Sequence, residues 1–118
     1  MNYTLPETRN DFVAMRLSGK LDQNDCGEYI SILEERINRY GRISLFCDMA
    51  DLDGWTPAGL WADTQFDIKH ASDFKRIAFV AEKKWLDLVT QAMKPFTSAE
   101  LRHFDLAERD EALQWAKT

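Results

Sequence analysis

The 118-residue sequence predicts an α/β domain, with a mostly parallel or mixed sheet of about five strands, an N-terminal β-hairpin and four covering helices. Runs of strand-forming residues alternate with amphipathic segments of helical length, which is typical of βαβ units. The composition is 45% hydrophobic and 30% charged, with only 5 glycines and 3 prolines, and indicates a packed core rather than a disordered chain. The length fits one domain over residues 1–118.

The first part of the chain predicts the hairpin followed by a helix. Residues 12–17 are rich in strand formers, and residues 3–5 can pair with them. Asp22 and Asp25 form an acidic version of a capping box, and Gly41 suits the end of the helix. Apolar residues at steps of three and four predict the core-facing stripe, namely Cys26, Ile30, Leu33, Ile37 and Tyr40.

The remaining elements alternate in the same way. Residues 43–48 form a short apolar strand that leads into an Asp-rich loop ending at Trp55, and Thr56 as N-cap with Pro57 at the first helical position begins a helix to Ala71. We then expect a strand at 76–81, a helix at 83–93, a strand at 101–105 and a helix at 106–117. One hydrophobic core is predicted, formed by Ile30, Leu33, Ile37, Leu45, Phe46, Ile77, Phe79 and Val80.

Charge, cysteine content and missing motifs exclude several classes of protein. The 20 acidic residues outnumber the 15 basic ones, which argues against a nucleic-acid partner. Cys26 and Cys47 have no metal-binding spacing and are expected to be buried thiols. Nucleotide-binding and hydrolase motifs are absent, and His70 and His103 lie in no catalytic pattern. We therefore expect a protein that is not an enzyme, with no catalytic residues, metal or cofactor.

Three aspartates near the end of the central strand form a candidate site. In parallel sheets, ligands usually meet the carboxyl ends of strands, where Asp48, Asp51 and Asp53 lie. Carboxylates at such a position could coordinate Mg²⁺ or accept phosphate. The alternative is that aspartate favours turns, because its side chain bonds nearby backbone N–H groups.

The helix predicted at residues 57–71 is apolar around more of its circumference than docking on one sheet requires. Its polar face is expected to carry Gly59, Asp63, Asp67 and His70. Its large apolar side chains and two neighbouring tryptophans predict a ligand-binding surface of Trp55, Leu60, Trp61, Phe66 and Trp85. The alternative is that these side chains pack against other helices.

Several segments resemble the bacterial SpoIIAA-like proteins. They are Gly54-Trp55-Thr56, Leu60-Trp61-Ala62-Asp63, Arg76-Ile77-Ala78-Phe79-Val80, Lys83-Lys84-Trp85, Pro95-Phe96-Thr97, Arg102-His103-Phe104 and Glu111-Ala112-Leu113-Gln114-Trp115. Together they extend over almost the whole chain. The resemblance implies a STAS-type fold, named for sulfate transporters and anti-sigma-factor antagonists and similar to the CRAL-TRIO lipid-binding fold. It also implies a small protein without enzymatic activity.

The resemblance also concerns a phosphorylation motif. Anti-sigma-factor antagonists carry a phosphorylatable serine in an Asp-Ser-Ser-Gly-Leu motif at the start of the helix after the central strand. The matching segment is Thr56-Pro57-Ala58-Gly59-Leu60, in which Pro57 and Ala58 replace the two serines. The region of Thr56, Ala58 and Gly59 is therefore expected to cap the helix without a serine phosphoswitch.

These observations lead to a main hypothesis and two alternatives. The main hypothesis is a non-catalytic module that binds an apolar or amphipathic small molecule or lipid, with the helix at 57–71 as a mobile lid hinged at Gly54. Lys83 and Lys84 would add a patch for an anionic surface, placing a cytoplasmic protein peripherally at the inner membrane. The alternatives are a regulatory domain that binds a protein partner through the same face, and a metal or phosphate site at the three aspartates.

Overall fold

The computed structural model, which describes residues 3–82 and 99–118, contains one five-stranded sheet in the order β1-β2-β3-β4-β5. The short β1 (Tyr3–Thr4) is antiparallel to β2 (Phe12–Leu21). The strands β2, β3 (Ile43–Trp55), β4 (Phe74–Val80) and β5 (Glu100–Phe104) are parallel. The predicted hairpin and mainly parallel α/β sheet are thus confirmed.

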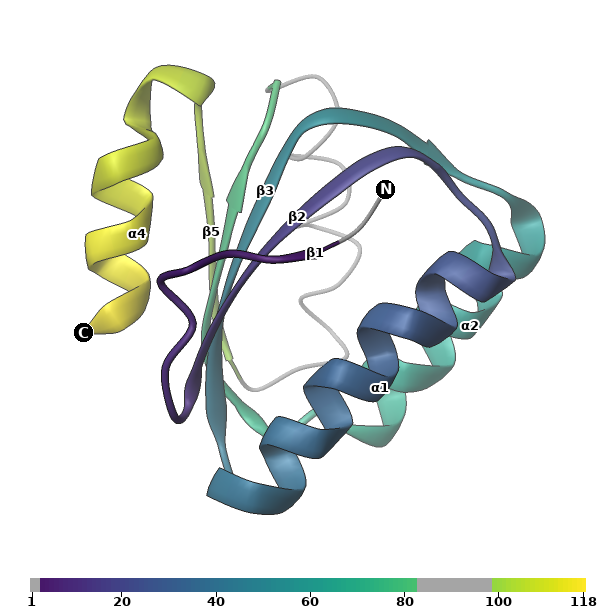
Figure 1. The fold of residues 1–118 in the computed structure, drawn as a ribbon, viewed down its shortest axis with the longest axis horizontal. Helices are drawn as coiled ribbons and strands as arrows, with labels where there is room; N and C mark the ends of the chain where they lie inside the picture. Colours follow the sequence, from purple (N-terminus) through teal and green to yellow (C-terminus); the bar gives the residue numbers. More distant parts are fainter. Residues whose placement is uncertain (1–2, 83–98) are drawn as a thin grey trace.

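Helices cover both faces of this sheet (Figure 1). The helices α1 (Gln23–Tyr40) and α2 (Pro57–Lys69) lie side by side on one face. On the other face lies α4 (Arg109–Lys117), which a 3₁₀ turn at Leu106–Glu108 precedes. The described residues therefore contain three α-helices rather than the four predicted for the whole chain, and the helix predicted at 83–93 lies outside them.

The central strand β3 is much longer than predicted. The loop predicted from Asp48 to Trp55 is wrong, because these residues continue the strand and pair with the end of β2 up to Leu21↔Trp55. Asp51 and Asp53 are exposed while Leu52 is partly buried, which is the alternation of a strand with one covered face. The ends of β2 and β3 form a curved two-stranded ribbon, and each of these strands leads directly into one of the two helices, α1 and α2 (Figure 1).

Because both helices follow this ribbon, the N-termini of α1 and α2 lie next to each other. The predicted N-caps of both helices are confirmed. Asp22 and Asp25 form the capping box of α1, with each side chain accepting the other residue's backbone N–H. The Thr56 backbone N–H donates to the Leu21 carbonyl at 2.8 Å, which fixes the start of α2 against the end of β2. The position of α2 is therefore set by a backbone hydrogen bond at its N-cap residue.

The buried residues form two clusters, one on each face of the sheet, so the prediction of one core is wrong. Leu33, Ile37, Leu45, Ile77 and Phe79 belong to the cluster under α1 and α2, and Ile30 packs at its margin. Phe46 and Val80 belong to the cluster under α4, because neighbouring residues of a strand point to opposite faces.

The buried stripe of α1 also differs from the prediction. It consists of Cys26, Tyr29, Leu33 and Ile37. Tyr29 takes the place expected for Ile30, and Tyr40 is 39% exposed at the end of the helix. Both cysteines are buried, as predicted.

Candidate functional site

The helix α2 turns part of its predicted polar face inward and part of its predicted apolar face outward. Gly59 and His70 are buried and Asp63 is partly buried, while the Asp67 side chain lies outside the described part. Leu60, Trp61 and Ile68 are 51%, 64% and 55% exposed. Of the predicted apolar surface of this helix, only Phe66 is buried.

A close backbone contact explains the inward position of Gly59. A Cβ atom on this residue would lie 2.5 Å from the Leu21 carbonyl oxygen, closer than such atoms approach one another. Only glycine therefore lets the first turn of α2 pack this closely on the end of β2.

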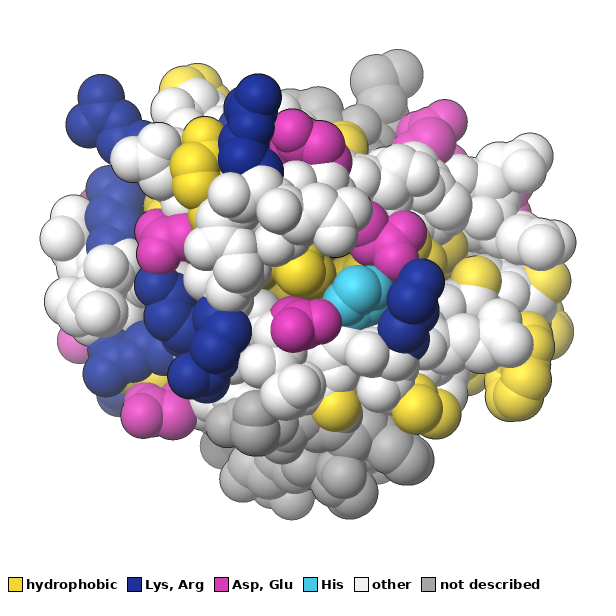
Figure 2. Space-filling model, turned by 90° about the horizontal axis from the view of Figure 1, so that it is seen from below, with side chains coloured by type: hydrophobic (Ala, Val, Ile, Leu, Met, Phe, Trp, Pro, Cys, Tyr) yellow, Lys and Arg dark blue, Asp and Glu magenta, His cyan; other side chains and the backbone are white. Residues whose placement is uncertain are grey.

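Carboxylates explain the inward position of His70. Its Nδ1 lies 2.7 Å from the Asp73 carboxylate and its Nε2 lies 2.9 Å from the Glu34 carboxylate. Each ring nitrogen therefore lies within hydrogen-bond distance of one carboxylate. The bond from His70 holds the pKa of Glu34 below its usual value. Lys69 forms an ion pair with the same Glu34 carboxylate, and Figure 2 shows a histidine at the surface with acidic and basic side chains around it.

Asp63 is held inward by Tyr29 of α1, whose hydroxyl donates to the Asp63 carboxylate. Burial raises the pKa of Asp63, and the bond from Tyr29 offsets part of this increase. Burial, together with the neighbouring Asp63 charge, also raises the pKa of Tyr29. Perturbed groups of this kind are typical of functional sites, although structural pairs show them too.

We expect Asp63→Asn to stabilise the protein at neutral pH. A raised pKa means that the folded protein binds this proton more tightly than the unfolded chain, so stability falls as the pH rises through the Asp63 pKa. Asparagine keeps an acceptor for Tyr29 and removes the charge. Melting temperatures between pH 3 and pH 8 test this, and the gain should disappear below the ordinary aspartate pKa of about 3.9. A variant less stable than the parent at neutral pH would contradict the prediction.

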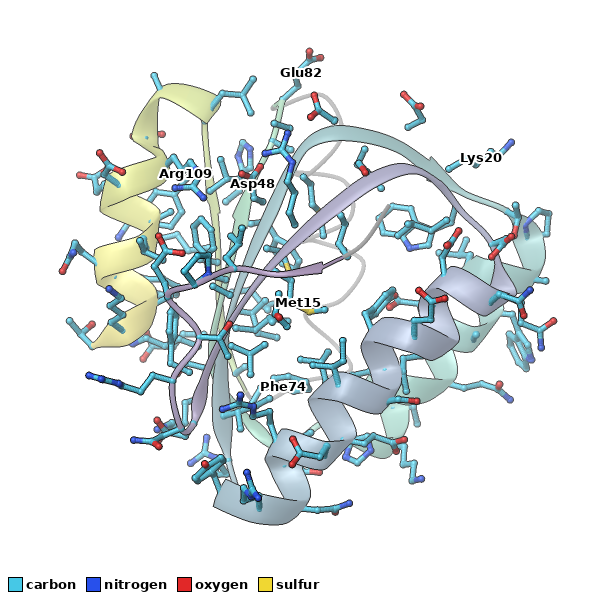
Figure 3. All side chains as sticks on the ribbon, viewed as in Figure 1. Met15, Lys20, Asp48, Phe74, Glu82 and Arg109 are labelled. Atoms are coloured by element: carbon cyan, nitrogen blue, oxygen red, sulfur yellow. The ribbon has the colours of Figure 1, made fainter. Side chains whose placement is uncertain are left out.

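Tyr29 and Asp63 lie in the wall of a cavity between the sheet and the two helices. Its volume is about 40 Å³, and most of its lining is apolar, from β2, β3 and β4. Figure 3 shows two lining residues, Met15 and Phe74, between the sheet and α1. Trp55 and Phe66 line it as well.

The structure thus divides the predicted ligand-binding residues. Trp55 and Phe66 face the cavity, whereas Leu60 and Trp61 are exposed on α2. Trp85, Lys83 and Lys84 lie outside the described residues. Tyr29 was not predicted as a site residue, although the spacing of Cys26, Tyr29, Leu33 and Ile37 at three and four residues was a usable signal.

Thr56 caps α2 as predicted, with its side-chain oxygen accepting the Gly59 N–H at 3.0 Å. Ala58, which the resemblance places at the phosphorylated serine, is exposed in the first turn. The hydroxyl nearest to this position is therefore engaged in holding the helix.

Removal of this cap should have a moderate effect. We expect Thr56→Ala to cost about 1 kcal/mol of unfolding free energy, because the Gly59 N–H loses its acceptor. Thr56→Ser keeps the oxygen and should remain close to the parent in urea unfolding. Stoichiometric phosphate on Thr56 in protein from its native cells would contradict a purely capping role.

The three predicted aspartates do not form one site. Asp48 Oδ2 accepts hydrogen bonds of 3.1 Å from both Arg16 of β2 and Arg109 of α4. Arg16 also bonds Asp51, while Asp53 is exposed. Figure 3 shows Asp48 and Arg109 next to each other between the sheet and α4. Asp48 is thus neutralised by arginines, and residues 3–82 and 99–118 contain no group of three acidic, histidine or cysteine side chains that could hold a metal ion.

The strand order, the helices on both faces and the capped helix after the central strand define the class of this protein, a STAS-type α/β protein. A family model described as SpoIIAA-like matches residues 12–117, and the chain belongs to the SpoIIAA-like family. The predicted resemblance is therefore confirmed.

Two solved structures are similar over nearly the whole chain. One is an uncharacterized protein of the DUF3478 family with a SpoIIAA-like fold from Shewanella loihica PV-4, with 25% identity, a TM-score of 0.80, and coverage of 98% of this chain and 93% of that one. The other is the anti-sigma factor antagonist SpoIIAA in its unphosphorylated form, with 12% identity, a TM-score of 0.62, and coverage of 97% and 98%. The second likeness concerns the fold alone. No curated protein matches the chain.

Proposed function

We propose that this protein is a regulatory domain that binds a protein partner through the outer face of α2. The observation that carries the proposal is the exposure of Leu60, Trp61 and Ile68 on α2, while Asp63 and the C-cap residue His70 are bonded on its inner side. Exposed apolar patches mark interaction sites, and tryptophan is frequent among the residues that dominate binding energy. The fold is that of an anti-sigma factor antagonist, which supports a role in protein recognition without enzymatic activity.

Regulation of this contact would differ from the serine switch that the family resemblance suggests. Ala58 has no hydroxyl, and the Thr56 oxygen is engaged with the Gly59 N–H. Control of partner binding would therefore use a signal other than phosphorylation at this helix start.

Quantitative affinity purification from the source cells tests the proposal. We expect a stoichiometric partner to copurify with the parent and to be lost with Trp61→Ala. Tyr40→Ala is a matched control, because Tyr40 is also an exposed aromatic residue but lies at the end of α1. Equal recovery of the partner with both variants would contradict a contact at α2.

A second candidate function, binding of an apolar or amphipathic molecule, is favoured by the cavity that Trp55 and Phe66 line. The part of this hypothesis that places the protein at a membrane depends on Lys83 and Lys84, which lie outside the described residues. None of the described helices is long and apolar enough to cross a bilayer.

A further inference from the structure

We infer that the cavity between α1, α2 and the sheet binds a compact, neutral and mostly apolar molecule that carries one hydrogen-bond acceptor. The inference rests on the second candidate function and names its ligand class. It is independent of the proposed protein contact, because that contact uses the opposite side of α2.

The size and walls of the cavity indicate a small molecule. A volume of about 40 Å³ exceeds the 10 to 15 Å³ that one water needs, but is too small for a long acyl chain unless α2 moves. Met15, Met49 and Cys47 are part of the wall. Methionine side chains are flexible and polarizable, so this wall can adapt to the shape of a ligand.

Trp55 supplies the reason for an acceptor. Its indole lines the cavity, and its Nε1 atom is buried without a hydrogen-bond partner among the described residues. A buried donor that is left unpaired destabilises a protein, and native structures nearly always satisfy such groups. A carbonyl, ether or hydroxyl oxygen on a bound molecule would satisfy this N–H.

The pair of Tyr29 and Asp63 supplies the reason for a neutral ligand. The Tyr29 hydroxyl already donates to Asp63, so it offers no second donor to a ligand. A carboxylate ligand would meet the Asp63 carboxyl in the same wall, and two such groups in an apolar site repel each other when ionised. An ammonium ligand would compete with the Tyr29 hydroxyl for the Asp63 carboxylate, and because it has only donors it would still leave the Trp55 N–H without an acceptor.

A ligand larger than the cavity needs movement near α2, and Gly54 offers a position for it. Gly54 directly precedes Trp55 and has a φ of 124°, a conformation that other residues rarely adopt. A change at this residue would move both Trp55 and the start of α2.

Nuclear magnetic resonance of the ¹⁵N-labelled full chain tests the inference through the indole N–H signal of Trp55, which Trp55→Phe identifies. The probes are cyclopentanone, methylcyclopentane of similar shape but without the acceptor, cyclopentanecarboxylate and cyclopentylammonium. We expect cyclopentanone to shift the Trp55 signal and to bind more tightly than either charged probe. These comparisons use the parent protein alone, so they do not depend on the folding of a variant.

Variants then separate the hydrogen bond from the apolar contacts. Trp55→Phe should weaken cyclopentanone binding about tenfold more than it weakens methylcyclopentane binding, because only the ketone loses a hydrogen bond and tenfold is the upper range for one neutral bond. Leu45→Phe should weaken the binding of both by filling the cavity. Trp61→Ala should affect neither probe, although it should abolish the proposed protein contact, so the two proposals fail separately.

Three results would overturn the inference. The first is an unchanged Trp55 signal at every soluble concentration of cyclopentanone. The second is a charged probe that binds as tightly as cyclopentanone. The third is equal affinity of the parent and Trp55→Phe for cyclopentanone, which would show that the indole N–H does not contact the ligand.

Discussion

Replacement of both Arg16 and Arg109 by methionine should destabilise the protein by about 3 to 5 kcal/mol, because the Asp48 carboxylate would remain buried without a charged partner. The Asp48 side chain is only 3% exposed, and apart from the two arginines its hydrogen-bond partner is the Ala50 N–H. Methionine keeps much of the apolar contact of each arginine, including that of Arg109 with the Phe46 ring. The loss of stability in the double variant is therefore due mainly to the unpaired charge of Asp48.

The two arginines should also act together. Either single variant leaves Asp48 with one guanidinium, so the double variant should cost more than the sum of the single variants in urea unfolding. Adding Asp48→Asn to the double variant removes the unpaired charge and should restore part of the stability. If this third substitution lowered the stability further, the unpaired carboxylate would not be the source of the loss.

The sequence could predict those parts of the fold that depend on neighbouring residues. The capping box of Asp22 and Asp25 and the Thr56 cap are interactions between residues three apart, and both were predicted correctly. The alternation of strands and helices was also predicted correctly, because the spacing of apolar residues along the chain differs between strands and helices.

The orientation of α2 could not be predicted in the same way. Helical periodicity assigns Gly59, Asp63 and His70 to a solvent-facing side. In the folded chain, they contact Leu21, Tyr29 and Glu34, residues more than thirty positions away. A polar side chain can be buried when such a partner satisfies it, and the partner is not visible in the local pattern. This one difference converts a predicted ligand surface into a cavity on one side of α2 and an exposed apolar face on the other.

The extension of β3 was missed for a related reason. Aspartate is rare in strands and frequent in turns, so the segment from Asp48 to Trp55 was interpreted as a loop. Its pairing with the end of β2 overrides this preference, since Asp51 and Asp53 point to solvent and Asp48 bonds two arginines. The aspartates thus form part of a strand and not a convergent metal site.

Leu33→Ala should lower the free energy of unfolding by about 2 to 5 kcal/mol, the range for truncation of a buried leucine. Leu33 is 2% exposed and belongs to the cluster beneath α1 and α2. Leu60→Ala is the matched control, because Leu60 is 51% exposed and its truncation should change stability by less than about 0.5 kcal/mol. Urea unfolding of both variants measures the difference, and equal stability would mean that the buried face of α1 is wrongly assigned.

In Leu33→Ala, a ligand in the cavity should have a larger effect on stability than in the parent, since Leu33 forms part of the cavity lining. Truncation there enlarges an existing apolar space instead of creating a separate one, and such spaces bind small apolar molecules. Methylcyclopentane binds only the folded state in this scheme, so it should raise the melting temperature of Leu33→Ala more than that of the parent or of Leu60→Ala. An equal increase in all three proteins would indicate a general solvent effect, and would show that the truncated side chain does not open onto the cavity.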